Sequence, residues 1–564
     1  MTRSGTSNGV GPATASWSAA HRSAPVEVTS VLVVGGGPAG LAAAIELGSR
    51  GVECVVVEPR TSVSHKRPRG KTTHARTMEH FRRWGISAEL RALTPTPSAV
   101  FHDVAFCSSL LGREFHRLPN ALGLFAQRQP QMAETGIFVG QPYVEETLRR
   151  KVATLAPVRT LYGARATGAI RSAPTHVDVE IADADGNCRI VRARYVVVAD
   201  GPRSTLRQAL DVPLVGGDAG RQSVSVLFRA PGLWDRVRLD PAVFYWCVGN
   251  NGAGNLSPYD VGDGLWVASS QNLQSVTDPG SVIDALVGEP VDVEVLNVDV
   301  WQARRAVADR YRVGRFFLVG DAARQTPPWG GHGYNTCVLD AVDLAWKLAA
   351  VLDGWAGDPL LDTYEVERRA VAEYVIESST RNMRVLSDDL VRTGAEGDGP
   401  QGEAVRAELA RDIDRTKRSE FYSLGLILGY NYAHSPAVLG ADAGQPSRQP
   451  GDGTVYEPSF RGGARLPHTW LADGRSIYDL LGSGFTLLTD EHTDDAAEIA
   501  AAAARRAVPL TVLTRSQLPE SYVRPSLVLV RPDQHVTWSG EHLAVSAATL
   551  WDVATGHVRA PQRA

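Results

Sequence analysis

A glycine-rich motif near the start of the chain has the spacing needed to bind a phosphate group. Gly35, Gly37 and Gly40 follow a short β-branched run and precede an Ala- and Leu-rich segment. Such glycines permit a tight turn and a close approach of the backbone to a pyrophosphate, and the next helix supplies free N–H groups. Glu58 ends the next apolar run, where a carboxylate accepts hydrogen bonds from a ribose diol. The motif predicts dinucleotide binding but does not distinguish NAD from FAD.

Two further carboxylates follow predicted strands. Asp200 comes after the apolar run 195–199, and Asp321 comes after 316–319. Ligands bind at the carboxyl ends of the strands in open α/β sheets. The Gly-rich loop 327–335 comes next, and its backbone amides would face a ring edge beside a helix N-terminus. Turn formation would explain one of these motifs but does not explain all of them in this order.

The elements that must position these motifs indicate an α/β (α+β composite) chain. Residues 28–57 read as a β-α-β unit, and 214–300 read as short alternating strands of a mostly antiparallel sheet. The organisation that we expect is a disordered tail at 1–27, a nucleotide-binding domain at 28–212 and 301–395, a sheet domain at 213–300 with parts of 100–140, a helical segment and linker at 396–453, and a small α/β domain at 454–564.

Composition excludes several classes of protein. The 564 residues carry a net charge of -4, which excludes coating of nucleic acid by charge alone. No apolar run approaches the length of a membrane span, and residues 1–26 lack the apolar core of a secretory signal. The 5 cysteines are scattered without a C-x-x-C pair, and the histidines lack metal-ligand spacing. We expect a cytoplasmic protein without a metal site.

At these residues the chain resembles the single-component FAD-dependent aromatic hydroxylases of the para-hydroxybenzoate and phenol hydroxylase type. The match extends from about residue 31 to 369, and segments 465–471 and 527–532 resemble the thioredoxin-like tail of the longer polyketide-tailoring hydroxylases. The resemblance implies a Rossmann-like FAD-binding domain interleaved with a substrate-binding sheet, plus a C-terminal thioredoxin-like domain. Because that last domain has no cysteine, disulfide chemistry is excluded there, and packing or subunit contact is its expected role.

The resemblance also implies roles for individual residues. The residues expected at FAD are Gly35, Gly37, Pro38, Ala39, Gly40, Glu58, Arg67, Arg69, Gln141, Asp200, Asp321, Pro328, Gly331, Gly333, Tyr334 and Asn335. Arg324, His332 and Cys337 depart from the residues common in the family. His332 is a candidate catalytic residue, although packing of the loop is favoured for it, and a structural role is favoured for Cys337 over a thiol with a lowered pKa.

The activity implied is that of a monooxygenase that uses NAD(P)H and O2 to hydroxylate an aromatic substrate through a flavin C4a-hydroperoxide. A phenolic, quinol or polyketide-derived substrate of secondary metabolism is expected. The substrate-pocket candidates are Arg229, Phe244, Tyr245, Trp246, Trp266, Trp301 and Pro328, because aromatic walls suit flat apolar substrates and arginine suits an anion. About half of the aromatic candidates are expected to be core residues. Glu145 and Glu146 read as a solvated helix face. The sequence identifies no catalytic base and leaves homo-oligomer formation open.

Other readings stay open at this point. A Baeyer–Villiger-type oxygenase, a halogenase or an FAD-linked reductase could use the same fold, although no W-x-W-x-I-P string typical of halogenases is present. A non-enzymatic scaffold that keeps FAD for structural reasons is the alternative of a different class. The intact loop 327–335 argues against a scaffold.

Overall fold

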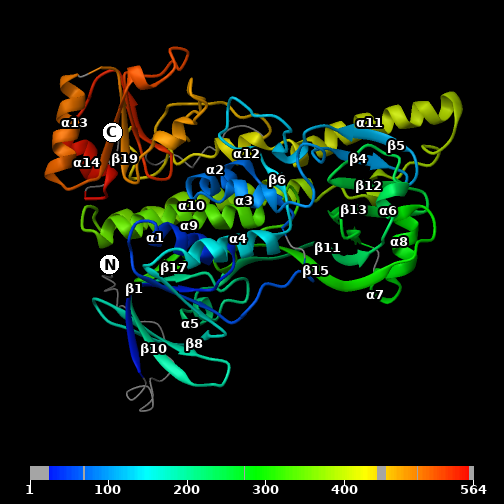
Figure 1. Cartoon of the computed structure of the whole chain (residues 1–564), viewed down its shortest axis with the longest axis horizontal. Coiled ribbons are helices and arrows are strands. Elements are labelled where there is room, and N and C mark those ends of the chain that lie inside the picture. The colour runs from blue at the N-terminus through cyan, green and yellow to red at the C-terminus, as the bar shows by residue number, and fades with distance from the viewer. Residues whose placement is uncertain (1–24, 68–69, 272–273, 441–452, 492, 558–564) are drawn as a thin grey trace, which may run out of the picture.

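The computed structural model describes residues 25–67, 70–271, 274–440, 453–491 and 493–557 (Figure 1). Residues 1–24, which make up most of the expected tail, and the expected cofactor residue Arg69 lie outside this part of the chain. The first strand already begins at Val26, so residues 26 and 27 belong to a strand and not to a tail.

A first sheet holds the three predicted strand ends side by side. Its central strands run parallel in the order β17-β10-β1-β2-β7. The strands of this sheet are β1 (Val26–Val34), β2 (Cys54–Glu58), β7 (Val158–Tyr162), β8 (Arg165–Ser172), β9 (Val177–Ala182), β10 (Cys188–Val198), β16 (Arg312–Val313) and β17 (Phe316–Leu318). In β1, β2 and β10 the central residues are buried and mostly valine, as expected of parallel strands covered on both faces.

A second sheet, at the right of Figure 1, is antiparallel except where β12 pairs with β4. Its strands are β4 (Val104–Cys107), β5 (Glu114–Leu118), β11 (Leu214–Arg229), β12 (Phe244–Gly249), β13 (Gly252–Asp260), β14 (Leu265–Ser270), β15 (Glu294–Ala308) and β18 (Arg324–Gln325). Strand β15 continues past the expected boundary at residue 300, and β18 comes from the segment assigned to the nucleotide-binding domain. The two domains are therefore interleaved along the chain.

The two faces of this second sheet differ in character. One face, called the inner face here, carries Ser225, Ser257, Ser269 and Trp301, which the strand register places on the same side. The opposite face, called the outer face, carries an apolar cluster that helix α8 (Pro279–Val287) covers. The inner face thus combines serines with aromatic and aliphatic residues, and the contacts described below turn it toward the first sheet.

Helices pack on both sides of the first sheet and between the domains. Helix α1 (Pro38–Gly48) packs along α9 (Gly333–Leu352), and residues of both belong to the largest apolar core. The other helices are α2 (Ala75–Arg83), α3 (Ser87–Ala92), α4 (Gln141–Ala153), α5 (Thr205–Ala209), α6 (Leu233–Arg236), α7 (Gln274–Thr277), α10 (Pro359–Asn382), α11 (Gly399–Phe421) and α12 (Leu424–Gly429). The short strands β3 (Thr72–Thr73) and β6 (Ile137–Phe138) form a separate pair.

The C-terminal domain has the expected thioredoxin-like arrangement. Strands β20 (Leu510–Thr514), β19 (Phe485–Thr489), β21 (Leu527–Val530) and β22 (Val536–Gly540) form one mixed sheet, flanked by α13 (Asp494–Arg505) and α14 (Ala547–Ala554). The domain appears in orange and red at the upper left of Figure 1, beside the ends of α9 and α10. A buried charge network joins it to those helices: Arg531 lies 2.7 Å from Glu367 and 3.0 Å from Asp343.

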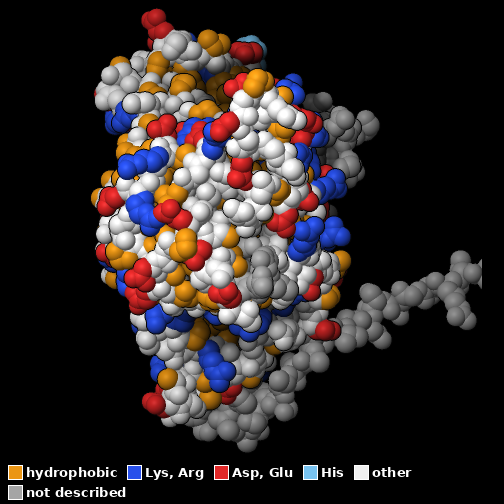
Figure 2. Space-filling model, turned by 90° about the vertical axis from the view of Figure 1, so that its right-hand side faces the viewer, with side chains coloured by type: hydrophobic (Ala, Val, Ile, Leu, Met, Phe, Trp, Pro, Cys, Tyr) orange, Lys and Arg blue, Asp and Glu red, His pale blue; other side chains and the backbone are white. Residues whose placement is uncertain are grey.

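On the face seen in Figure 2, the basic and acidic side chains are interspersed. Among the described residues, no helix is long and apolar enough to cross a membrane.

Candidate functional site

The predicted nucleotide-binding residues meet at one edge of the first sheet. Gly35 follows β1, Glu58 ends β2, Asp200 follows β10 and Asp321 follows β17. Because these four strands are parallel neighbours, their carboxyl ends lie together.

The three glycines of the first motif differ in why the structure needs glycine there. Gly35 has φ +109°, and a Cβ there would lie 2.1 Å from the carbonyl oxygen of Ala199. A Cβ on Gly40 would lie 1.8 Å from the carbonyl oxygen of Gly35, so only glycine lets helix α1 approach the loop. Gly37 is different, because a Cβ there would meet no protein atom within 4 Å. The space beside Gly37, at the N-terminus of α1, is open to a ligand.

Glu58 is held rigidly where the second strand ends. Its Oε2 accepts a hydrogen bond from the Gly36 amide at 2.7 Å, and its Oε1 accepts from the Arg60 amide at 3.0 Å and from Arg60 Nε at 2.7 Å. The carboxylate is almost fully buried. Each carboxylate oxygen keeps further lone pairs, so a ribose diol can still be bound.

Arg207 joins the two segments that carry the later carboxylates. Asp200 accepts from the Leu206 amide at 3.2 Å, while its Oδ1 is buried without a protein partner among the described residues. Burial raises the pKa of Asp200. The Arg207 guanidinium donates to the carbonyl oxygens of Pro202, which follows β10, and of Ala322, which follows β17. The Asp321 side chain is exposed, and the Cys337 thiol donates to it at 3.6 Å.

The loop that precedes α9 is shaped by glycines and fixed by Asn335. Gly330 has φ +87° and Gly331 has φ +70°, which the conformational freedom of glycine permits. The Asn335 amide donates to the carbonyl oxygens of Thr72 and Gly331, each at 2.8 Å, and its oxygen accepts from the His74 amide at 2.8 Å. The Asn335 side chain therefore anchors the loop to β3. Pro328 is exposed, and a Cβ on Gly333 would meet no protein atom within 4 Å.

Two other predicted cofactor residues contact the segment before β3, and a third contacts the second sheet. Tyr334 forms a hydrogen bond with the Thr73 hydroxyl. A Cβ on Gly70 would lie 3.0 Å from Tyr334 and 3.1 Å from Gln141 Oε1, so Gln141 and Tyr334 both contact the segment before β3. The third residue, Arg67, is exposed and lies 3.9 Å from Asp299 of β15, between the two sheets.

Glu145 corrects the expectation of a solvated face on α4. It is buried, accepts from Gln141 Nε2 at 2.8 Å and lies 3.2 Å from Arg60. Glu146 is half-exposed and pairs with His65 at 2.8 Å. The two carboxylates point apart, as expected of neighbours on a helix, but Glu145 faces the nucleotide edge and not solvent.

His332 lies beneath the loop and faces the protein interior. Its ring centroid lies 4.9 Å from that of His74, and its surroundings include Leu339, Val371 and Leu426. Burial holds the pKa of His332 well below its usual value. We therefore assign His332 to packing under the loop. Burial and Asp321 raise the pKa of the Cys337 thiol, opposite to activation by a helix N-terminus.

The inner face of the second sheet carries only part of the predicted substrate wall. Phe244 is half-buried and packs edge-on against Phe138. Trp301 is also half-buried, donates from Nε1 to Ser225 Oγ at 2.9 Å and lies 6.2 Å from Trp329 of the loop. These two aromatic side chains remain candidates for contact with substrate.

The other substrate-wall candidates are corrected. Tyr245 and Trp266 belong to the apolar cluster of the outer face, because side chains alternate along a strand. Trp246 points to the inner face but is covered by α11, where Phe421 and Lys417 pack on its ring. Arg229 forms an exposed ion pair with Glu294 at 2.6 Å, so its charge already has a partner. The aromatic residues of these strands are buried as their type indicates. Only the strand register shows which face of the sheet each side chain occupies.

Sequence reasoning missed Lys71. Its Nζ donates to Ser257 Oγ of the inner face at 2.7 Å and lies 4.9 Å from the centroid of the Phe244 ring. Burial lowers the pKa of the Lys71 ammonium to about 7. The rarity of lysine in a chain with so many arginines was the only sequence signal, and it carries no positional information.

The polar groups at the nucleotide edge fit an FAD cofactor. The open space beside Gly37, the buried Asp200 Oδ1 without a partner and the ordered Glu58 carboxylate match a pyrophosphate, a polyol and a ribose diol. Among the described residues no group of His, Cys, Asp and Glu could hold a metal ion, and the five cysteines are free.

Comparisons with known proteins agree with this geometry. Residues 28–379 match the FAD binding domain family, and residues 460–561 match the aromatic-ring hydroxylase C-terminal family. The 4-methyl-5-nitrocatechol 5-monooxygenase of Burkholderia sp is 32% identical, covering 91% of this chain and 94% of that protein. Aklavinone 12-hydroxylase RdmE of Streptomyces purpurascens is 32% identical, covering 92% and 96%. The structure of RebC with bound 7-carboxy-K252c is 35% identical with a TM-score of 0.84, covering 95% of this chain and 100% of that one.

Proposed function

Because the chain belongs to the FAD-dependent aromatic-ring hydroxylases, we propose that it uses NAD(P)H and O2 to hydroxylate a flat aromatic compound of natural-product metabolism. The observation that carries the proposal is the Asn335-anchored loop between the nucleotide edge and the inner face of the second sheet. When bound, FAD would accept electrons from NAD(P)H and would activate oxygen.

The residues of the nucleotide edge hold and orient the cofactor in this proposal. Gly35, Gly37 and Gly40 let the backbone approach the pyrophosphate, and Glu58 accepts hydrogen bonds from the ribose. Asp200 and Asp321 would hold the central polyol. The amides that begin α9 would stabilise negative charge on the bound ring system.

The inner face orients the substrate and moves its proton. Phe244 and Trp301 offer ring faces for a flat compound. Lys71 lies between the loop and the sheet with a pKa of about 7, so its amine accepts the proton of a phenol near neutral pH. A phenolate is more electron-rich than a phenol and is therefore the better oxygen acceptor. The packed loop and sheet exclude water from the reacting atoms.

The proposed substrate class rests on the names of two relatives. Nitrocatechol and aklavinone, named in the two enzymes, are phenolic compounds of different size. The likeness to RebC, at 35% identity and a TM-score of 0.84, favours a larger aromatic compound over a simple phenol. A Baeyer–Villiger outcome is the second candidate, because substrate geometry at the same site would decide between ring hydroxylation and insertion.

The test is NADPH oxidation by the FAD-loaded protein in air, measured with and without phenols and polycyclic aromatic compounds. The expected result is strong stimulation by one compound and a product heavier by one oxygen atom from labelled O2. Bound flavin without stimulation by any compound of the panel would count against the hydroxylase. A lactone product would favour the Baeyer–Villiger alternative.

A further inference from the structure

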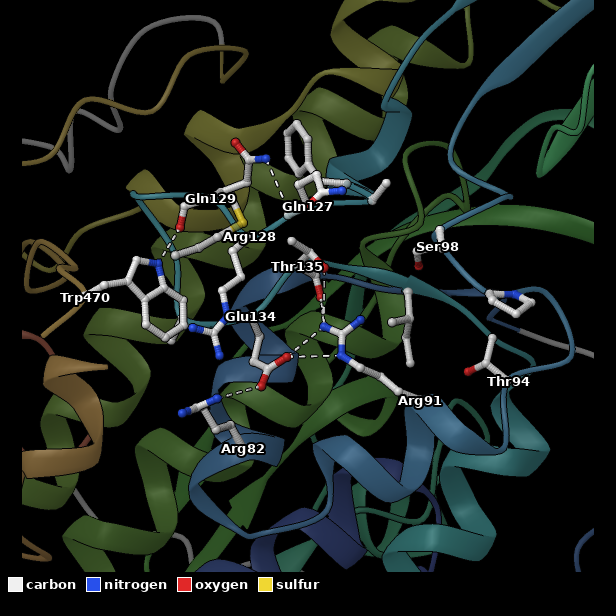
Figure 3. Close-up of a pocket in the computed structure, with 17 residues that line it drawn as sticks. Arg82, Arg91, Thr94, Ser98, Gln127, Arg128, Gln129, Glu134, Thr135 and Trp470 are labelled. Atoms are coloured by element: carbon white, nitrogen blue, oxygen red, sulfur yellow. Dashed lines mark hydrogen bonds and ion pairs between the residues drawn. The ribbon is translucent and has the colours of Figure 1, made fainter. Parts of the chain in front are cut away.

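A cavity lies across the β3–β6 pair from the loop 327–335, which is called the flavin loop from here on. It measures about 380 Å³ and lies between the loops around residues 94–99 and 125–135, with Trp470 of the C-terminal domain on one side (Figure 3). Its volume falls in the range of small-molecule binding sites. None of the residues expected at FAD or substrate lines it.

One wall of the cavity is cationic. Arg82 and Arg91 share the carboxylate of Glu134, at 3.2 and 2.7 Å, and Arg82 also pairs with Asp479 at 2.7 Å. Arg128 is exposed and has no carboxylate partner among the described residues. Three guanidinium groups thus face two carboxylates, which leaves a net positive charge centred on Arg128.

Arg128 is nevertheless held in place. Its guanidinium lies 4.4 Å from the centroid of the Trp470 ring and donates to the Gly474 carbonyl oxygen at 3.4 Å. Trp470 is fixed in turn, because its Nε1 donates to the carbonyl oxygen of Gln129 at 3.0 Å. Figure 3 shows Arg128 between Trp470 and Glu134, with Arg91 across the cavity. An ordered cation of this kind costs less entropy on binding an anion than a free surface arginine does.

The opposite wall is apolar and leads toward the flavin loop. Phe125, Met132 and Ile137 line it. Ile137 pairs with Thr73 in the β3–β6 ladder, and the Thr73 hydroxyl contacts Tyr334. One pair of strands, about 5 Å apart, therefore separates the cavity from the loop.

We propose that this cavity binds the phosphorylated adenosine end of NADPH, with the 2′-phosphate on Arg128 and the adenine against the apolar wall. The chain has a single dinucleotide-binding motif, which the FAD edge uses, so a reduced nicotinamide dinucleotide needs another anchor. Cationic and apolar walls facing each other match a ligand with a flat ring and a phosphate. The inference rests on the proposed function, since it names where that function's reductant is held.

The first test does not require turnover. Adenosine 2′,5′-bisphosphate, which has no nicotinamide, is titrated calorimetrically into the oxidised, FAD-loaded full chain. We expect saturable binding that Arg128→Ala weakens by about tenfold, the effect of losing one charge-assisted contact. Arg411→Ala, which removes an exposed arginine on α11, is the matched control and should bind the probe as the wild type does. An absence of binding, or equal binding by Arg128→Ala and wild type, would overturn the proposal.

A kinetic experiment shows whether the cavity binds NADPH or an anionic aromatic substrate. Arg128→Ala should raise the KM for NADPH about tenfold without changing kcat, and should leave the KM for NADH unchanged, because NADH lacks the 2′-phosphate. If an aromatic carboxylate such as 2-naphthoate displaces the bisphosphate, and only the KM for the aromatic substrate changes in Arg128→Ala, the cavity belongs to the substrate and the proposal is wrong. The calorimetric titration measures binding in the cavity even if no compound stimulates NADPH oxidation. Failure of the proposed function can therefore be told apart from failure of the proposed binding site.

Discussion

The Lys71 Nζ donates a hydrogen bond of 2.7 Å to the Ser257 hydroxyl, which joins the segment before β3 to the inner face of the second sheet. Ser257 is fully buried, and the Phe244 ring lies on the same side of Lys71. A titratable amine from the nucleotide-binding half of the chain is thus held against the surface that we assign to the substrate. This relationship supplies the base that the proposed function requires.

The first prediction concerns the pH profile of Lys71→Met. In the wild type, kcat/KM should rise with pH through about 7, as the amine loses its proton and can accept that of the phenol. The variant should lose this limb and about 10²-fold in rate, the lower end of general-base catalysis. The measurement is kcat/KM from pH 5.5 to 9, with bound flavin quantified as the control. An unchanged acid limb in Lys71→Met would assign the proton transfer to another group.

The same residue makes a second prediction about stability. The folded-state pKa of Lys71 is about 7, below its ordinary value of 10.5. Between these values the unfolded chain binds more protons than the folded chain, so the free energy of unfolding should receive a contribution that rises with pH. Below pH 7 the full cost of burying the charge is present. Urea unfolding at pH 7 and pH 9.5 should show a smaller gain for Lys71→Met than for the wild type, and equal gains would contradict the buried-amine assignment.

A third prediction compares two glycines of one motif. Gly35→Ala should destabilise the protein by about 1–3 kcal/mol or more, because the residue has φ +109° and a Cβ would clash with the Ala199 carbonyl. Gly37→Ala should change the stability of the FAD-free chain by less than about 1 kcal/mol, since φ is -78° and the space is open. It should nevertheless weaken FAD binding at least tenfold. Thermal unfolding and flavin titration separate the two effects, and normal FAD affinity in Gly37→Ala would remove the pyrophosphate from that space.

The sequence predicted the strand ends well because their signals are local. The runs before Gly35, Asp200 and Gly320 are short, buried and apolar, as is typical of the strands of a parallel sheet that is covered on both faces. Glycine positions carry a second local signal, since positive φ and close approach exclude other residues. The antiparallel character of the second sheet was also readable, because its strands alternate.

What could not be read from the sequence depends on register and on contacts across the chain. Tyr245 and Trp246 are adjacent aromatic residues, yet they lie on opposite faces of β12. Glu145 and Glu146 divide in the same way on α4. Lys71 acquires its surroundings from Ser257, 186 positions away, so no local pattern marks it. The cationic cavity forms only when Trp470 packs beside the loop that contains Arg128.

A fourth prediction separates the two faces of the second sheet by a pair of tryptophans. Trp266→Ala should cost about 3–5 kcal/mol of stability, because the side chain is fully buried in the outer-face core. Trp301→Ala should cost about 1 kcal/mol and should raise the KM for the aromatic substrate, because this half-buried ring lies on the inner face beside Trp329. Chemical unfolding and steady-state kinetics measure the two quantities. A Trp301→Ala enzyme with unaltered substrate affinity would leave Phe244 as the remaining aromatic contact.

The last prediction concerns the role of the C-terminal domain. Arg531 is buried among Glu367, Asp343 and Asp533, and the Lys347 ammonium lies 2.8 Å from Asp343 on α9. Arg531→Met would leave three buried carboxylates facing one lysine, which should cost about 3–5 kcal/mol of stability. Because α9 begins at the flavin loop, the FAD affinity of the variant should fall as well. Arg475→Met is the matched control, since that arginine belongs to the same domain but forms an exposed pair with Asp473 and should cost at most about 1 kcal/mol. Equal stability and equal flavin affinity in the two variants would mean that the domain does not support the cofactor loop through this network.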